Sequence, residues 1–95
     1  MANYRISSDA KEDLRRIYRR GVIEFGEAEA DLYFDALFER FEELAERPNM
    51  YQAVDDIRVG YRRSVCGVDS INYRTIDGTV EIMRILGQQD TEQQL

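Results

Sequence analysis

The sequence contains no histidine and a single cysteine, Cys66. One cysteine cannot form a disulfide bond within the chain, and without histidine or a second cysteine there is no recognisable zinc site. The missing histidine also removes the residue that enzymes use most often as a general acid or base. Chemistry by aspartate, glutamate, tyrosine or arginine stays possible. We expect no metal and no cofactor, and we expect no catalytic residue because no cluster of cations follows the final strand either. We interpret Cys66 as a small hydrophobic residue within a strand.

Long hydrophobic runs are also missing. No apolar stretch approaches the roughly 20 residues that cross a bilayer, and residues 1–5 lack the apolar segment of a signal peptide. We therefore expect a cytoplasmic protein without membrane contacts. The composition is nevertheless that of a folded domain, because 43% of the residues are hydrophobic and disordered chains have fewer. Ninety-five residues bury one modest core, which predicts a single domain.

Positive charge is in deficit, with 13 basic residues against 19 acidic ones and a net charge of −6. This balance disfavours non-specific nucleic-acid binding, which depends on neutralising phosphates, so we expect no direct binding to DNA. The distribution is uneven. Residues 27–47 contain eight acidic residues and two arginines, whereas residues 9–20 and 57–86 each contain five basic residues and three acidic ones. The sequence thus predicts two locally basic surfaces and one acidic helix.

The first half of the chain predicts two amphipathic helices. Residues 7–9 offer an N-terminal cap, with Asp9 and Glu12 at the spacing of a capping box, and Gly26 is placed to end the first helix. Pro48 marks the end of the second helix. The apolar stripes, at spacings of three and four residues, are Ala10, Leu14, Ile17, Tyr18, Val22 and Phe25 in the first helix and Ala30, Tyr33, Leu37, Phe41 and Leu44 in the second. The short connection between them predicts a helical hairpin.

Short alternating segments at residues 3–6, 61–66, 70–76 and 79–86 predict four strands, and residues 49–60 are expected to be irregular. The last three strands are joined by Gly67-Val68 and Asp77-Gly78, which suit two-residue hairpin turns of types II′ and I′. We therefore expect an α+β fold in the order β-α-α-β-β-β, with the helical hairpin packed on a small antiparallel sheet. Residues 1–86 form the domain, and residues 87–95 are expected to be a solvated tail.

The two turns fix a register in which Tyr73 lies opposite Arg62 and Ile82, and Arg74 lies opposite Tyr61 and Glu81. The register divides the strand residues into two faces. One carries Arg62, Ile71, Tyr73, Val80, Ile82, Arg84 and Leu86, and the other carries Tyr61, Arg63, Val65, Arg74, Ile76, Glu81, Met83 and Ile85. We expect one face to pack on the helical hairpin and the other to keep an apolar strip that something else covers.

Several short phrases along the chain are specific as a set, although each alone is what an ordinary helix or strand carries. They are Tyr4-Arg5-Ile6-Ser7 with Ala10, Asp13-Leu14 with Ile17-Tyr18, Phe25-Gly26 before Ala30 and Tyr33, Phe41 with Leu44 and Pro48, Gly60-Tyr61-Arg62, Tyr73-Arg74, and Ile82 with Arg84-Ile85-Leu86. On these phrases, the chain from Tyr4 to Leu86 resembles the ParE branch of the RelE/ParE toxin superfamily.

The resemblance implies a RelE-like α+β fold and the toxin component of a type II toxin–antitoxin system. It further implies that the protein inhibits DNA gyrase by binding, and that a ParD-type antitoxin neutralises it. Family members often carry histidine at the positions of Asp69 and Gly87. Since the family is not thought to use these histidines in chemistry, the two departures bear on the contact surface.

Two other functions stay open. The RelE branch has the same fold and cleaves messenger RNA in the ribosome with lysine and arginine side chains that stabilise developing charge. Arg62 and Arg84 are candidates for remnants of that apparatus. However, those nucleases carry lysine and arginine just after the final strand, where this chain reads Gly87-Gln88-Gln89-Asp90, and no tyrosine follows Tyr73. The other alternative is an interaction protein that has the toxin fold but has lost toxicity.

We assign the candidate contact residues to two surfaces. Residues beside the helix stripes and nearby arginines are expected to bind an antitoxin helix in a groove: Arg15, Tyr18, Arg19, Val22, Phe34, Phe38, Arg58 and Arg63. The residues expected to contact the target are Arg62, Tyr73, Arg74 and Arg84. Simpler interpretations exist, since a solvated helix face explains Arg15 and Arg19, and an ion pair with Glu81 explains Arg74.

Overall fold

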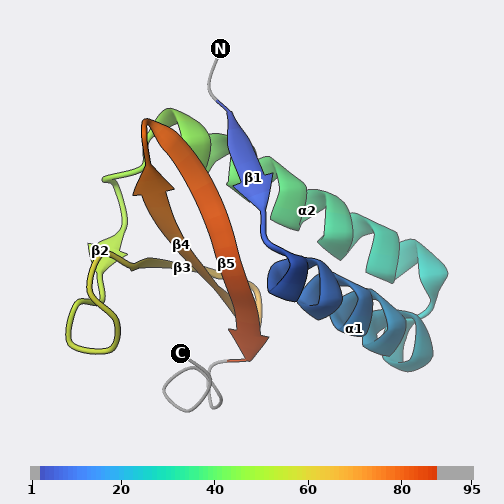
Figure 1. Ribbon diagram of the computed structural model, residues 1–95. Coiled ribbons are helices and arrows are strands. Elements are labelled where there is room, and N and C mark those ends of the chain that lie inside the picture. Colours follow the sequence, from blue (N-terminus) through green and yellow to red (C-terminus); the bar gives the residue numbers. More distant parts are fainter. Residues whose placement is uncertain (1–2, 88–95) are drawn as a thin grey trace.

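The computed structural model describes residues 3–87 (Figure 1). Its elements are β1 (Tyr4–Ile6), α1 (Ser8–Phe25), α2 (Glu27–Glu46), β2 (Gln52–Ala53), β3 (Arg62–Cys66), β4 (Asp69–Ile76) and β5 (Thr79–Gly87). This order confirms the expected α+β class. The short β2 lies inside the segment 49–60 that the sequence predicts to be irregular. Gly87, expected in the tail, ends β5, and the rest of the predicted tail lies outside the described residues.

The sheet has the strand order β1-β5-β4-β3-β2 and is mixed. β1 pairs with β5 in parallel, with Tyr4 beside Val80 and Ile6 beside Ile82, whereas the other neighbours are antiparallel. The expectation of an antiparallel sheet is therefore wrong at this edge. β5, the strand that pairs with β1, is the last in the sequence. It follows the helical hairpin and the three other strands, and it runs in the same direction as β1.

Both predicted hairpin turns are present, because Cys66 pairs with Asp69 and Ile76 pairs with Thr79. Asp77 and Gly78 both have positive φ, at 51° and 78°, as a type I′ turn requires. The predicted register is confirmed where Tyr73 faces Arg62 and Ile82, and where Arg74 faces Glu81. Tyr61 precedes β3 and forms no ladder pair with Arg74.

A β-bulge changes the register beyond Ile82. Tyr73 faces Ile82 but Asn72 faces Arg84, so Met83 is an extra residue in β5. Because successive side chains alternate between faces, Ile85 joins Ile82 on the core face, while Arg84 and Leu86 turn to the other face. Uninterrupted alternation predicts that Arg84 and Leu86 share a face with Ile82, and this prediction is wrong because the bulge shifts the alternation by one residue.

The core lies between the sheet and the two helices, which cover one face (Figure 1). It contains Ala10, Leu14, Ile17, Leu37, Phe41, Leu44, Cys66, Ile71, Tyr73, Val80, Ile82 and Ile85. Cys66 is buried, as expected for a filler, and its burial raises the pKa of the thiol. Phe25 was predicted within the apolar stripe of the first helix, but it is the last residue of α1 and is 70% exposed. Neither helix is long and apolar enough to cross a membrane.

The helices begin and end close to the predicted positions. The cap of α1 is Ser7, whose hydroxyl accepts a hydrogen bond from the amide of Ala10 at 3.0 Å, so Asp9 does not serve as the cap. Gly26 lies between the helices with a φ of 92°, which favours glycine. α2 ends at Glu46, just before Pro48.

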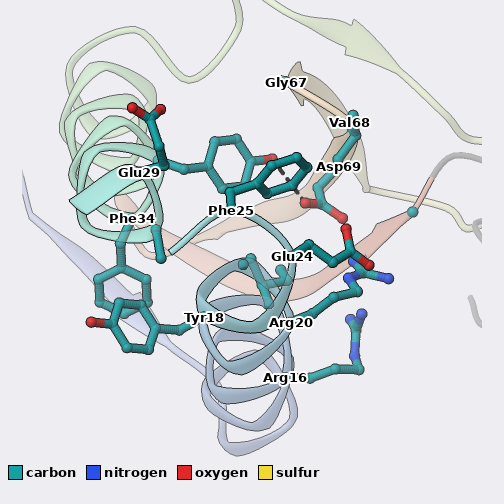
Figure 2. Close-up of a pocket in the computed structure, with 15 residues that line it drawn as sticks. Arg16, Tyr18, Arg20, Glu24, Phe25, Glu29, Phe34, Gly67, Val68 and Asp69 are labelled. Carbon is teal, nitrogen blue, oxygen red and sulfur yellow. Dashed lines mark hydrogen bonds between the residues drawn. The ribbon is translucent and has the colours of Figure 1, made fainter. Parts of the chain in front are cut away.

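The β3–β4 turn is fixed by Tyr33 of α2. Its hydroxyl lies 2.7 Å from the carbonyl oxygen of Cys66 and 2.8 Å from Oδ2 of Asp69. The ring packs against Gly67, where an added Cβ would lie 2.5 Å from Cε1 of Tyr33. Figure 2 shows Gly67, Val68 and Asp69 at this end of the sheet, beside the helical hairpin. Only glycine at position 67 leaves room for this contact.

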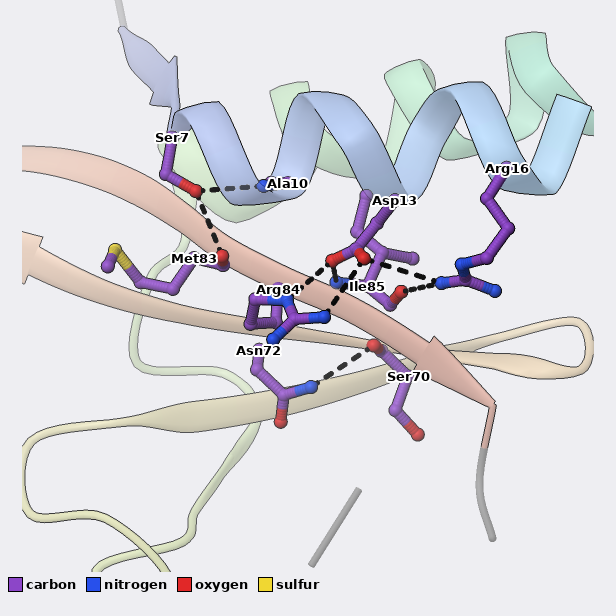
Figure 3. A network of polar contacts seen from close by, with 9 residues as sticks. All are labelled: Ser7, Ala10, Asp13, Arg16, Ser70, Asn72, Met83, Arg84 and Ile85. Carbon is purple, nitrogen blue, oxygen red and sulfur yellow. Dashed lines mark hydrogen bonds and ion pairs between the residues drawn. The ribbon is translucent and has the colours of Figure 1, made fainter. Parts of the chain in front are cut away.

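The edge of β5 beyond β1 is covered by polar groups at the start of α1 (Figure 3). Ser7 donates its amide to the carbonyl of Ile82 and its hydroxyl to the carbonyl of Met83, each at 2.9 Å. Oδ2 of Asp13 accepts the amide of Ile85 at 2.9 Å, and Arg16 donates to the carbonyl of the same residue at 3.0 Å. Unpaired backbone groups on an edge strand are a template for unwanted pairing, and α1 removes them here.

Asp13 also binds the side chain of Arg84 through two hydrogen bonds of 2.8 and 3.1 Å. The carboxylate is 4% exposed, and the hydrogen bond to it raises the pKa of Arg84. The paired geometry is that of a strong guanidinium–carboxylate contact. One side chain thus joins α1 to both the backbone and a side chain of β5.

We expect the change Asp13→Ala to lower the free energy of unfolding by about 3 kcal/mol, because it leaves a half-buried guanidinium and a buried amide unpaired. Urea denaturation measures this quantity. Glu12→Ala on the same helical turn is the control, since Glu12 is exposed and pairs with Arg15 on the surface, where such pairs contribute little. Equal losses in the two variants would contradict the role assigned to Asp13.

The contact between Tyr33 and Gly67 predicts that Gly67→Ala lowers stability more than Gly78→Ala does. Both glycines have positive φ, at 61° and 78°, but nothing lies within 4 Å of a Cβ at Gly78. Gly78→Ala should cost about 1 kcal/mol of stability from backbone strain alone. Gly67→Ala should cost about 1–3 kcal/mol more, because the methyl group displaces Tyr33. Thermal unfolding of both variants tests this difference, and equal costs would show that the contact with Tyr33 is easily relaxed.

Candidate functional site

A groove of about 560 Å³ lies on the outer side of the helical hairpin, next to the end of β1. We call it the hairpin groove, and its walls are Ile6, Lys11, Leu14, Arg15, Tyr18, Asp31, Phe34 and Phe38. The aromatic rings form a row. The ring centroids of Tyr18 and Phe34 are 5.3 Å apart, those of Phe34 and Phe38 are 5.1 Å apart, and Phe38 packs in turn on the buried Phe41. The groove therefore has an apolar floor that is continuous with the core.

The rim of the hairpin groove is polar. Lys11 and Arg15 supply positive charge from α1, and Asp31 supplies negative charge from α2. The hydroxyl of Tyr18 donates to Asp31 at 2.6 Å, and this hydrogen bond raises the pKa of Tyr18 to about 12. An apolar floor with charged edges is the geometry that receives an amphipathic helix.

The structure brings together half of the residues predicted to bind the antitoxin. Arg15, Tyr18, Phe34 and Phe38 all line the hairpin groove. Val22, half-buried, and Arg19, exposed, lie further along α1 and are not among the residues of its walls.

Arg58 and Arg63 lie elsewhere. Arg58 follows β2 and stacks over the ring of Tyr61 at 5.5 Å, and Arg63 belongs to β3, opposite Asn72. Because β5 and β4 separate β3 from β1 in the sheet, these two arginines cannot share the rim of the hairpin groove. The sequence could not separate the two groups, since it shows only that both segments are basic.

The four residues predicted to contact the target do not form one surface. Tyr73 is fully buried, and its hydroxyl donates to the carbonyl of Pro48 at 2.8 Å, which makes it a core residue. Arg62 lies on the core face and donates to the carbonyl of Tyr51 at 2.7 Å. Arg84, on the opposite face because of the bulge, is held by Asp13. The expectation that Arg62 and Arg84 share a face is therefore wrong.

The remaining member, Arg74, pairs with Glu81 across the strands at 2.9 Å. The simpler interpretation of Arg74 as one half of a cross-strand ion pair is thus present in the structure. Its side chain is still 38% exposed, against 25% for that of Arg84.

The structural roles of two side chains, Asp13 and Arg40, are not among the predictions from the sequence. Asp13 falls between Ala10 and Ile17 on the buried stripe of α1, so its spacing was a signal that a carboxylate is buried. Arg40 donates to the hydroxyl of Ser64 at 2.7 Å and to the carbonyl of Val65 at 2.8 Å, and it covers the outer edge of β3. Nothing in the pattern around Arg40 distinguishes it from a solvated helix residue.

A second pocket, of about 580 Å³, lies between the end of α1, the start of α2 and the β3–β4 turn (Figure 2). We call it the turn pocket. Its walls include Asp69 and Gly87, which face each other across β4 and β5. These are the two positions where the resemblance described above leads one to expect histidine. Tyr18 and Phe34 line both depressions, so the turn pocket adjoins the hairpin groove.

Comparison with known proteins extends over almost the whole chain. Residues 4–91 match the model of the family described as ParE toxin of type II toxin–antitoxin system, parDE. The chain is 38% identical over 88 residues to Toxin ParE1 of Caulobacter vibrioides, covering 93% of this chain and 91% of that protein. It is 31% identical over 88 residues to Toxin ParE1 of Mycobacterium tuberculosis, covering 92% and 90% respectively.

The fold has relatives among solved structures. A chain of the chromosomal ParDE system from P. aeruginosa superposes with a TM-score of 0.79 at 21% identity, covering 92% of this chain and 96% of that one. A chain of the RelBE2 toxin–antitoxin complex from Mycobacterium tuberculosis superposes with a TM-score of 0.68 at 21% identity, covering 92% and 98%. Together with the sequence matches, these similarities establish that the chain belongs to the ParE toxin family, within the RelE/ParE superfamily.

Proposed function

We propose that this protein is a toxin that inhibits DNA gyrase by binding to it, and that a ParD-type antitoxin neutralises it. The observation that carries the proposal is the match to the ParE family over residues 4–91, because resemblance to that branch implies gyrase as the target. The 38% identity to a ParE1 toxin over nearly the full length supports the same branch.

The arrangement of the arginines supports binding rather than RNA cleavage. A nuclease without histidine needs cationic groups free to hold the scissile phosphate and to stabilise the charge that develops on it. Here Arg62 donates to a backbone carbonyl, and Arg74 and Arg84 are paired with carboxylates. We therefore propose that the protein is not an enzyme.

The hairpin groove is the proposed docking site for the antitoxin. A segment that folds on binding needs apolar anchors to offset the loss of its conformational entropy, and Phe34 and Phe38 provide an apolar floor. Lys11 and Arg15 on one wall favour acidic residues on the partner. The edges of the sheet are less suitable, since side chains of Asp13 and Arg40 already occupy backbone groups there.

Gyrase inhibition is tested with purified components. We expect the protein to reduce the supercoiling of relaxed plasmid by gyrase in a dose-dependent way, and we expect equimolar antitoxin to restore it. Ribosome-dependent cleavage of messenger RNA with unaffected supercoiling would overturn the proposal in favour of the RelE type of activity. Loss of both activities, with antitoxin binding retained, would identify a toxin fold without toxicity.

Docking in the hairpin groove is tested by Phe34→Ala. Truncating a central aromatic anchor should cost about 2 kcal/mol of antitoxin affinity, or roughly thirtyfold in Kd. Isothermal titration calorimetry with a ParD-type antitoxin that binds the unsubstituted protein measures the change. Leu32→Ala is the matched control on the same helix, since Leu32 is 64% exposed and absent from the walls of the groove. Similar affinity of both variants would place the antitoxin elsewhere.

A further inference from the structure

The turn pocket has a buried carboxylate in its wall. Asp69 is 0% exposed, and its side chain belongs to β4 at the β3–β4 turn. Oδ2 of Asp69 lies 2.8 Å from the hydroxyl of Tyr33, whereas Oδ1 has no hydrogen-bond partner within the described part of the chain. Buried polar atoms in folded proteins are almost always hydrogen-bonded, so the free oxygen requires an explanation.

The hydroxyl of Tyr33, which donates to Asp69, has a second acceptor nearby. The hydroxyl of Tyr33 has one proton, and it lies 2.7 Å from the carbonyl of Cys66 as well as 2.8 Å from Asp69. Burial and the hydrogen bond to Asp69 raise the pKa of Tyr33, so the hydroxyl keeps that proton at neutral pH. The carbonyl of Cys66 and the carboxylate of Asp69 therefore compete for one proton. A carboxylate needs more donors than this to offset its desolvation.

The cations of the turn pocket do not supply those donors. Arg16 is already engaged with Asp13 and with the carbonyl of Ile85. Arg20 is exposed at the rim and forms no hydrogen bond with Oδ1 of Asp69. Figure 2 shows the carboxylate of Asp69 directed into the pocket, toward the ends of the side chains of Arg20 and Glu24.

The surroundings of Asp69 suit a long, partly apolar side chain that ends in a cation. Phe25, Ile17 and Ala30 provide apolar walls. The charged residues of the walls are three acids, Glu24, Glu29 and Asp69, and two arginines, Arg16 and Arg20, of which Arg16 is already paired with Asp13. Arginine and lysine both combine an apolar stem with a charged head. An acidic side chain would face Asp69 and be repelled.

We propose that the turn pocket receives a basic side chain of the antitoxin, whose head donates to Oδ1 of Asp69, and that Asp69 thereby determines which antitoxin segment fits. The identity of the partner rests on the proposed function, whereas the chemistry of the pocket does not. Because Tyr18 and Phe34 line both depressions, a helix in the hairpin groove has its neighbouring residues close to the turn pocket.

The test is a titration of the isotope-labelled protein with N-acetylarginine amide, followed by NMR at the amides of Val68 and Asp69. N-acetylcitrulline amide has nearly the same shape without the charge. We expect saturable shifts with arginine and a Kd at least about tenfold higher with citrulline, since charge-assisted hydrogen bonds are the stronger ones. Equal affinity for the two compounds, or no saturable shift with arginine, would overturn the proposal.

Variants assign the site within the same experiment. Asp69→Asn keeps an acceptor for Tyr33 and should weaken arginine binding at least about tenfold. Asp35→Asn removes the same charge from an exposed position on α2 and should leave binding unchanged. If Asp69→Asn does not fold, Arg20→Ala serves as the second variant: it removes a like charge from the rim, so it should retain or strengthen the arginine-dependent shifts, and their loss would overturn the assignment to Asp69.

Gyrase and antitoxin are both absent from this titration, so its outcome is independent of the supercoiling assay. A failed supercoiling assay with intact arginine binding would remove the proposed function and leave the pocket chemistry standing. Normal inhibition of gyrase without arginine binding would support the proposed function and overturn the proposal for the turn pocket.

Discussion

The contact between Asp13 and the free edge of β5 is the constraint on which the rest of the structure depends. β1 covers β5 only as far as Ile82, and the strand continues to Gly87. Beyond that point, Asp13 accepts the amide of Ile85 and holds the side chain of Arg84. The same carboxylate therefore fixes α1 against the sheet, and with it the wall that both the hairpin groove and the turn pocket share.

The elements of the fold could be predicted from local patterns, and its irregularities could not. Helix stripes, Gly26, Pro48 and the two glycine-containing turns are local signals, and each appears in the structure close to where the sequence places it. The bulge at Met83 depends on how two distant segments meet, and no glycine marks it. A single extra residue was enough to move Arg84 from one face to the other. The parallel pairing of β1 is likewise a property of the returning chain rather than of its own three residues.

Among the candidate site residues, too, those with a local signal could be predicted and those that depend on distant contacts could not. Tyr18, Phe34 and Phe38 were found because aromatic residues beside a helix stripe mark a partly covered surface, and they do meet in one groove. Tyr73 was misassigned because a tyrosine beside arginines resembles a contact residue, while its hydroxyl is in fact satisfied inside the core. Asp69 stands out only in three dimensions, because its hydrogen bond comes from Tyr33 of α2, far away in the sequence, while its other oxygen has no partner in the described part of the chain.

Covered sheet edges have a consequence for how such proteins coexist in one cell. The edge strands β1 and β2 are short, and backbone groups of β5 and β3 that lie beyond them are occupied by Ser7, Asp13, Arg16 and Arg40. Backbone pairing is indifferent to sequence, so an open edge would accept an extended segment from many different proteins. Under the proposed docking of the antitoxin by side chains in grooves, paralogous pairs can diverge by a few substitutions and remain insulated from one another's antitoxins.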